Sequence, residues 1–240
     1  MRIDNRKPDE LRPISIERNF ACNAHGSVLI QAGNTKILCT ASVEDSVPSH
    51  VKGTGNGWVT SEYSMLPGST SKRSIRESSR LKINGRTHEI QRLIGRSIRN
   101  IVDLSGFGER TIWIDCDVLQ ADGGTRTLAI TGGYIALVDA FQSMRNKEVI
   151  SVIPIRDSIA AISVGIVNGI CMLDLCYEED SNADVDMNII ATGNGEFVEI
   201  QGTGEQKTFS EKDLAKMLGY AKKGLNELTS IQTTILATPL

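Results

Sequence analysis

The sequence predicts an α+β fold in which strand hairpins and helices alternate, and two kinds of pattern support this. Runs rich in β-branched residues flank Gly and Asn turn formers, as in antiparallel hairpins. Longer segments carry apolar residues every three or four positions, as amphipathic helices do. With 240 residues, 40% of them hydrophobic and 23% charged, the chain can bury a core without a metal or a disulfide.

A hairpin is expected at the start of the chain, within residues 15–43. Its strands, VLIQA and KILCTASV, are separated by the turn-forming segment Gly33–Thr35. An amphipathic helix is expected over Thr87–Leu104, because apolar residues recur there at helical spacing. Three arginines share the polar face of this helix: Arg92, Arg96 and Arg99.

A strand, a glycine turn and a helix follow in the middle of the chain. The strand TIWIDCDVLQA leads into DGGTR (122–126), and a helix is expected from there to about Phe141, with a linker around residues 145–147. Two glycines let an anion approach the backbone closely, and a helix start offers free N–H groups and a positive dipole end. Gly123–Arg126 is therefore a candidate phosphate site, although tight packing alone explains many such turns.

The second half of the chain repeats the hairpin pattern. IAAISVGIV and ICMLDLCY flank Asn168–Gly169, while MNIIAT and EFVEIQGT flank Asn194–Gly195, and both dipeptides are strong hairpin signals. A closing helix is expected over Ser210–Leu228, capped by Ser210 with Asp213 nearby. Each half thus runs from hairpin strands to a helix, which suggests a duplication. No linker rich in Pro or Ser divides the halves, so we expect one interlocked body.

The charges are unevenly distributed along the chain. The net charge is −3, which argues against a simple polycationic nucleic-acid binder. Residues 72–110 nevertheless hold ten cations against four anions, and most of the cations are arginine. The guanidinium fork matches phosphate oxygens, so the cluster is predicted to bind a polyanion. A solvated helix face with ion pairs between subunits is the alternative interpretation.

Three aspartates lie in the segment EEDSNADVDMN between two predicted strands: Asp180, Asp184 and Asp186. If residues 184–188 are extended, Asp184 and Asp186 share a face, and Asp180 reaches back from the preceding strand. Oxygen ligands of this kind suit Mg²⁺, although a solvated acidic loop is the simpler alternative. An anion cradle, an arginine track and an oxygen-rich metal site together favour phosphoryl or nucleotidyl transfer.

Several other features indicate no further chemistry. The five cysteines are an odd set without CxxC spacing and are predicted to be reduced and mostly buried, and the three histidines are scattered. Trp58 and Tyr63 are candidates either for base stacking or for burial. The N-terminus carries both charge signs, and the longest apolar stretch, Ile159–Leu173, is too short and too interrupted to span a membrane. We therefore expect a cytoplasmic protein.

Long ordered stretches of the chain resemble the bacterial RNase PH family of phosphate-dependent 3′-to-5′ exoribonucleases, also called tRNA nucleotidyltransferases. These stretches include RPISIERNF, GTGNGWVTSEYSMLP, NGRTHEIQRLIGRSIRN, ERTIWIDCDVLQADGGTRTLAITGGYIAL, DLCYEEDSNADVDMN and EIQGTGE. The resemblance runs almost from end to end and implies a single phosphorolytic exoribonuclease domain over residues 1–240. It also implies a ribosomal protein S5 domain 2-like fold, with duplicated halves and mixed sheets packed with helices.

The resemblance assigns roles to residues that match the family's motifs. Phosphate binding is implied for Arg86, Gly124, Thr125 and Arg126. Asp180 and Asp186 are implied as metal ligands, with Mg²⁺ as the ion, and as catalytic residues together with Arg126. Six basic residues are the candidates for RNA contacts, and contacts between subunits are the alternative role for part of this set: Lys72, Arg73, Arg76, Arg92, Arg96 and Arg99.

The implied reaction uses inorganic phosphate to cut the 3′-terminal linkage and release a nucleoside diphosphate, and it is reversible. The implied partners are tRNA precursors, other structured RNA such as rRNA, and further copies of the chain in a hexameric ring, a trimer of dimers; neither DNA nor membrane is implied. A non-catalytic RNA-binding ring subunit and a metal-dependent hydrolase are the competing interpretations. One departure stands out: Gly68 occupies a position where the family usually has Arg.

Overall fold

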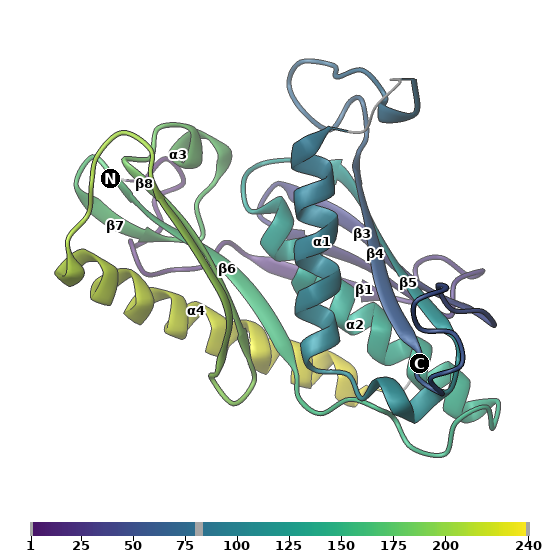
Figure 1. Cartoon of the computed structure of the whole chain (residues 1–240). Helices are drawn as coiled ribbons and strands as arrows, with labels where there is room; N and C mark the ends of the chain where they lie inside the picture. Colours follow the sequence, from purple (N-terminus) through teal and green to yellow (C-terminus); the bar gives the residue numbers. More distant parts are fainter. Residues whose placement is uncertain (1, 80–83, 239–240) are drawn as a thin grey trace.

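A computed structural model describes residues 2–79 and 84–238, in which two β-sheets pack with four α-helices (Figure 1). The strands, in chain order, are β1 (Ile14–Arg18), β2 (Gly26–Ala32), β3 (Thr35–Glu44), β4 (Trp58–Met65), β5 (Thr111–Gln120), β6 (Ile159–Val167), β7 (Ile170–Leu173), β8 (Val185–Thr192) and β9 (Phe197–Gly204). The helices are α1 (Gly85–Asn100), α2 (Thr125–Asn146), α3 (Tyr177–Ser181) and α4 (Glu211–Ala237), with short 3-10 turns η1 (Glu77–Ser79) and η2 (Leu104–Phe107). The predicted α+β class is confirmed.

The first sheet has the strand order β1-β2-β3-β5-β4. The predicted hairpin is confirmed, since β2 and β3 pair antiparallel around a turn in which Gly33 has a φ of 54°. Strand β4 was not predicted; it pairs parallel to β5 at the sheet edge. The mixture of parallel and antiparallel pairs arises because α1 crosses over between these two strands.

The second sheet has the order β7-β6-β8-β9, and all its pairs are antiparallel. Both predicted hairpins are confirmed, with left-handed backbone at Asn168, Gly169 and Gly195. The expected strand through Tyr177 is wrong beyond Leu173. Asp174 adopts a φ of 54° and its carboxylate binds Arg12, so the chain leaves the sheet there and forms α3.

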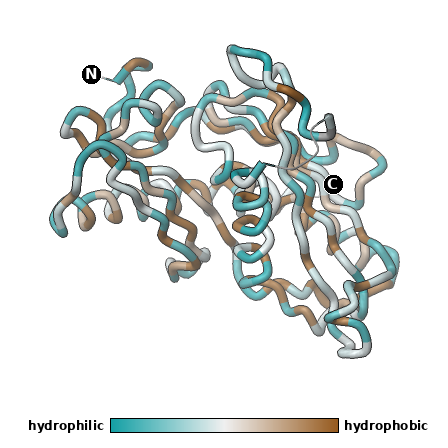
Figure 2. The backbone as a smooth tube through the Cα atoms, turned by 45° about the horizontal axis from the view of Figure 1, so that its top comes forward, coloured by the Kyte–Doolittle hydropathy of each residue, from teal (hydrophilic) through white to brown (hydrophobic). Residues whose placement is uncertain are grey.

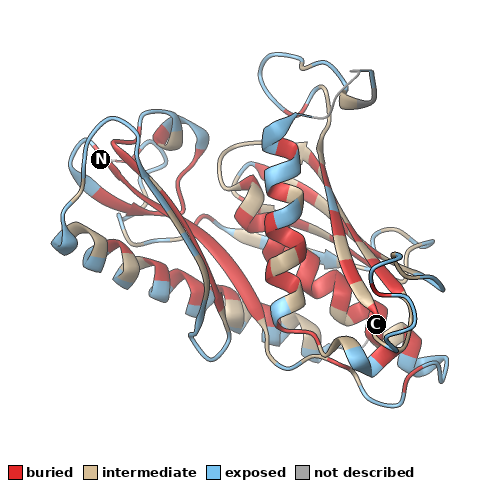
Figure 3. Ribbon diagram, viewed as in Figure 1, coloured by how far each residue is buried: buried red, intermediate tan, exposed pale blue. Residues whose placement is uncertain are grey.

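Helix α2 lies between the two sheets and packs against strands of both. It packs on β2, β3 and β5 of the first sheet and on β6 of the second, and α1 lies beside it against β4. Figure 3 shows α2 and β6 buried along most of their length, whereas α1 and α4 are buried on one side only. In Figure 2 the hydrophobic segments follow the strands and the inner sides of the helices.

Helix ends differ from the sequence-based expectations in ways that the local contacts explain. Helix α1 ends at Asn100 and not at Leu104, because Val102 forms an isolated bridge with Ile155. Helix α2 continues past Phe141 through the expected linker to Asn146, and α4 continues to Ala237. The predicted cap is confirmed, since Ser210 and Asp213 form a reciprocal capping box.

Four of the five cysteines are buried and all are free, as expected, with Cys22 exposed. Within the described part of the chain, the helices include none long and apolar enough to cross a membrane.

Candidate active site

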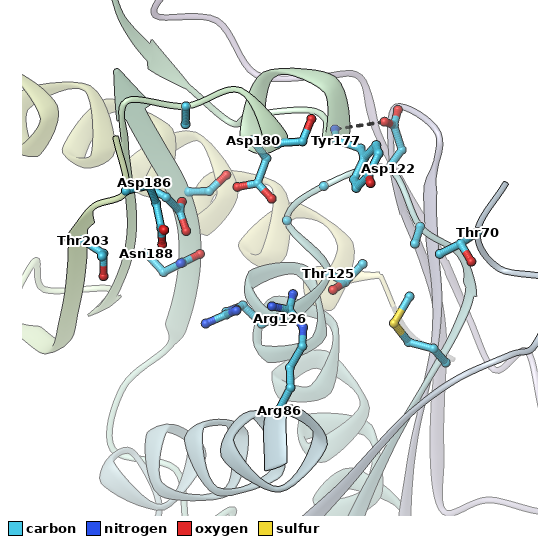
Figure 4. A pocket seen from close by; sticks show the side chains of 18 of the residues that line it. Thr70, Arg86, Asp122, Thr125, Arg126, Tyr177, Asp180, Asp186, Asn188 and Thr203 are labelled. Carbon is cyan, nitrogen blue, oxygen red and sulfur yellow. Dashed lines mark hydrogen bonds between the residues drawn. The ribbon is translucent and has the colours of Figure 1, made fainter. Parts of the chain in front are cut away.

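A cavity of about 1200 Å³ opens between the two halves of the molecule (Figure 4). The start of α2 and the start of α1 line one side of it, and α3 and β8 line the other. The structure brings together in this cavity all six residues predicted for phosphate, metal or catalysis: Arg86, Gly124, Thr125, Arg126, Asp180 and Asp186. In Figure 4 the two arginines extend toward the space below the two aspartates.

The glycine turn before α2 has the backbone geometry expected of an anion site. Gly123 and Gly124 have φ values of 74° and 62°, which L side chains rarely adopt. A Cβ atom on Gly123 would lie 2.7 Å from the backbone carbon of Cys176, so the chain also passes too closely for a side chain. Helix α2 begins at Thr125, and the first N–H groups of a helix have no partner within it. The turn therefore presents backbone donors to the cavity.

Three side chains add positive charge and a hydroxyl to this turn. Arg86 comes from the first turn of α1, whose N-cap is Asn84. Arg126 comes from the first turn of α2, and its Nη1 lies 3.7 Å from the Glu89 carboxylate. The hydroxyl of Thr125 is within 2.8 Å of the buried Tyr63 hydroxyl.

Tyr63 was not predicted as a site residue. It is buried, which settles its two interpretations in favour of burial, and burial raises the pKa of its phenol. The alternation in WVTSEYSM is the signal that places Tyr63 on the inner face of β4, but its partner Thr125 is 62 positions away and not visible in the sequence.

Two carboxylates face these cations across the cavity. Asp186 lies on β8 and Asp180 on α3, and burial raises the pKa of both. For Asp186 the nearby Asp180 charge adds to burial, and the pKa rises to about 6. Among the described residues, the buried Oδ1 of Asp186 has no hydrogen-bond partner. A mutually repelling, incompletely hydrogen-bonded carboxylate pair fits a divalent cation that binds few protein oxygens.

The third predicted aspartate is not brought into this group. Asp184 precedes β8, and its carboxylate accepts a hydrogen bond from the Gly169 N–H and lies 3.0 Å from Lys207 Nζ. Within residues 2–79 and 84–238, no group of three or more His, Cys, Asp or Glu side chains is arranged to hold a metal. A metal at this site would therefore have two protein carboxylates, which suits Mg²⁺ with water and substrate oxygens as its other ligands.

The six basic residues predicted for RNA contacts lie outside the cavity lining and fall into two groups. Lys72, Arg73 and Arg76 are exposed on the segment before α1, and Arg92 is exposed on α1. Arg96 and Arg99 have partners within the chain: Arg96 pairs with Glu199 on β9, and Arg99 lies 4.4 Å from the Trp58 ring. Arg80 and Lys82, also in the charge cluster, lie outside the described residues.

Comparison with protein families identifies the chain. Residues 10–141 match domain 1 of the 3′ exoribonuclease family, RNase PH type, and residues 157–224 match its domain 2. The chain belongs to the RNase PH family. Ribonuclease PH of Bacillus subtilis (strain 168) is 58% identical over 242 residues, covering 100% of this chain and 98% of that protein. Ribonuclease PH of Hydrogenobaculum sp. (strain Y04AAS1) is 55% identical over 232 residues, covering 97% and 91%.

Solved structures of more distant proteins share the fold. Rice (Oryza sativa) Rrp46 has a TM-score of 0.79 at 20% identity, covering 98% of this chain and 100% of that one. The Archaeoglobus fulgidus exosome with RNA bound to the active site has a TM-score of 0.80 at 21% identity, covering 95% and 91%. The predicted RNase PH fold is thus confirmed, and this RNase PH family member is a phosphorolytic 3′ exoribonuclease.

Proposed function

We propose that the enzyme trims the 3′ end of tRNA precursors, and of other structured RNA such as rRNA, with inorganic phosphate as the nucleophile. The observation that carries this is one cavity in which a glycine turn and two arginines face two half-buried carboxylates. Run in reverse, the same reaction adds nucleotides, as a tRNA nucleotidyltransferase does. A hydrolase uses water as the nucleophile, so it would not need the phosphate site that the glycine turn and the two arginines form.

Phosphate binds at Gly124–Arg126, with the Thr125 hydroxyl and the Arg86 and Arg126 guanidinium groups around it. One phosphate oxygen attacks the phosphorus of the 3′-terminal linkage, and the bond from that phosphorus to the 3′-oxygen of the shortened RNA breaks. The products are a nucleoside diphosphate and an RNA with a free 3′-hydroxyl, to which a proton is returned. The arginines neutralise charge on the transferring group.

Asp180 and Asp186 would hold Mg²⁺ in this proposal. The ion would neutralise charge at the phosphorus and at the leaving 3′-oxygen. The two carboxylates lie opposite the phosphate turn, where they would also take up or return the proton of that oxygen.

We infer further that the chain works as one unit over its length, because the main hydrophobic core joins residues of both sheets around α2, including Ile159, Ala161 and Ile190 of the second sheet. A hexameric ring, arranged as a trimer of dimers, is supported by the family and by the fold shared with an archaeal exosome core, whose TM-score is 0.77 at 21% identity. We further propose that the enzyme works in the cytoplasm, on the RNA substrates proposed above.

The product of the reaction tests the proposal. A tRNA carrying extra 3′ nucleotides is incubated with the purified chain and Mg²⁺, with and without phosphate, and the released nucleotides are separated by chromatography. Nucleoside diphosphates that appear only with phosphate are the expected result. Nucleoside monophosphates would mean hydrolysis and would contradict the mechanism.

Gly68 offers a second prediction. Gly68 is exposed, and a Cβ atom added to it would have no heavy atom within 4 Å. The carbonyl of the following residue, Ser69, accepts a hydrogen bond from the N–H of Ala121, which lies next to the phosphate turn in the sequence. Gly68→Arg is therefore expected to fold normally and to lower the KM for tRNA about threefold to tenfold through an added phosphate contact. The KM for inorganic phosphate stays unchanged.

The salt dependence of RNA binding provides the control for this variant. The slope of log affinity against log salt is expected to become steeper by about one unit in Gly68→Arg than in the wild type. If Gly68→Arg and the wild type have the same salt slope and the same KM for tRNA, this loop does not contact RNA.

A further inference from the structure

The phosphate turn is held from behind by a threonine that does not line the cavity. Thr35, the first residue of β3, is completely buried. Its hydroxyl donates a hydrogen bond to the carbonyl of Gly123 at 2.8 Å and accepts one from the N–H of Asp122 at 3.1 Å. One hydroxyl thus binds two backbone groups of the turn, using its single proton for one of them.

An arginine holds the neighbouring carbonyl. Arg12 donates from Nη1 to the carbonyl of Asp122 and, at 3.3 Å, to the hydroxyl of Thr35. Its guanidinium is fixed by Asp174, with Nε 3.0 Å from Oδ2 and Nη2 2.7 Å from Oδ1. Both side chains are buried. Burial lowers the pKa of Arg12, but the charge and the hydrogen bonds of Asp174, together with the nearby Asp122 charge, raise it above its ordinary value, so the arginine stays charged.

The third carbonyl of the turn is held by α2 itself. The carbonyl of Gly124 accepts hydrogen bonds from the Thr127 hydroxyl at 2.9 Å and from the Leu128 N–H at 3.0 Å. Three consecutive peptide groups therefore have their oxygens bound on the side away from the cavity.

Restraint of these oxygens determines where the N–H groups point. A carbonyl and the next residue's N–H belong to one planar peptide and point in opposite directions. Holding the carbonyls of Asp122, Gly123 and Gly124 therefore directs the N–H groups of residues 123–125 to the other side, which is the cavity. Two adjacent glycines otherwise have more backbone freedom than other residues, so this turn needs restraint from outside.

We propose that Thr35 and Arg12 are positioning residues for inorganic phosphate. They bind the carbonyl side of the turn and so keep its N–H groups aimed at the anion before it arrives. The inference rests on the proposed role of Gly124–Arg126 in phosphate binding. Because neither residue lines the cavity, their loss affects the affinity for phosphate and leaves the affinity for the RNA 3′ end unchanged.

Thr35→Val tests this with a side chain of nearly the same shape and no hydroxyl. The KM for phosphate, measured at saturating RNA, is expected to rise about tenfold, and the KM for RNA to stay within about twofold of the wild type. Thr35→Ser keeps the hydroxyl and is expected to restore the KM for phosphate to within about threefold. Arg12→Lys keeps the charge beside Asp174 but loses the fork, so its KM for phosphate also rises.

Thr111→Val is the matched control. Thr111 is likewise a buried threonine at the start of a strand, and its hydroxyl donates to the carbonyl of Ser46, in a loop outside the cavity lining. Its loss is expected to lower the denaturation midpoint about as much as Thr35→Val, with no change in the KM for phosphate. A purely structural role for Thr35 would make the two variants kinetically alike.

The outcomes separate this inference from the proposed function. Arg126→Ala is measured in parallel: an unchanged KM for phosphate in that variant would mean that the turn is not the phosphate site, and both proposals would fail. Arg126→Ala can instead raise the KM for phosphate while the KM of Thr35→Val equals that of the wild type or of Thr111→Val. In that case the positioning role alone is overturned. A rise in the KM for phosphate that Thr35→Ser reverses supports it.

Discussion

Asp186→Asn is expected to slow the release of nucleoside diphosphates about a thousandfold while RNA binds as tightly as in the wild type. The half-buried Asp186 carboxylate lies beside Asp180, and its buried Oδ1 has no hydrogen-bond partner in the described structure. An amide supplies neither the negative charge that a divalent cation requires nor a group that exchanges a proton with the 3′-oxygen. Single-turnover kinetics and RNA binding by fluorescence anisotropy give the two readouts.

Asp184→Asn provides the control, two positions away on the same segment. Its carboxylate faces Lys207 and the Gly169 N–H and does not line the cavity, so near-wild-type turnover is expected. Undiminished phosphorolysis in Asp186→Asn would place the chemistry elsewhere. A wild-type chain that binds RNA but releases no nucleotide would instead be a non-catalytic ring subunit.

Arg126→Ala is expected to lower kcat/KM for phosphate about a hundredfold. Because the loss is mainly in phosphate affinity, the rate of turnover is expected to recover in part at high phosphate concentration. The guanidinium enters the cavity from the first turn of α2, where it meets the anion together with the helix N–H groups. Its removal leaves those N–H groups, the Thr125 hydroxyl and Arg86 in place, so binding is weakened and not abolished. A phosphate titration at saturating RNA measures the effect.

Arg145→Ala removes the same charge from the other end of the same helix, where Arg145 is exposed. Its kinetics should match the wild type, so any general effect of net charge is accounted for. If both variants respond equally, or if phosphate does not rescue Arg126→Ala, the assigned role of Arg126 is wrong.

The hairpins and the capped C-terminal helix were predictable because local residues determine them. Asn168–Gly169 and Asn194–Gly195 adopt turns that few other dipeptides favour, and Ser210 with Asp213 caps α4 without distant help. The segment after Leu173 was not predictable in the same way. Its apolar residues suggest a strand, but the Asp174 carboxylate binds the guanidinium of Arg12, 162 positions earlier. The chain therefore leaves the sheet and forms α3.

In the candidate site, too, some residues could be predicted from local motifs, whereas others depend on contacts between distant parts of the chain. Its polar residues stand in short motifs that the family resemblance identifies, and the structure brings them into one cavity. The residues that support them do not stand out in the sequence. Thr35 and Tyr63 are ordinary strand residues whose partners, Gly123 and Thr125, lie 88 and 62 positions away. Only the packing of β3 and β4 beside the start of α2 reveals their contacts.

The central claim is that inorganic phosphate itself attacks the RNA, and labelled phosphate tests this most directly. The enzyme is supplied with ³²P-labelled inorganic phosphate and an unlabelled tRNA with extra 3′ nucleotides, and the products are separated by chromatography. We expect the label in the terminal phosphate of the released nucleoside diphosphates, and Arg126→Ala to incorporate far less of it at the same phosphate concentration. Shortened RNA accompanied by unlabelled nucleotides would contradict the account.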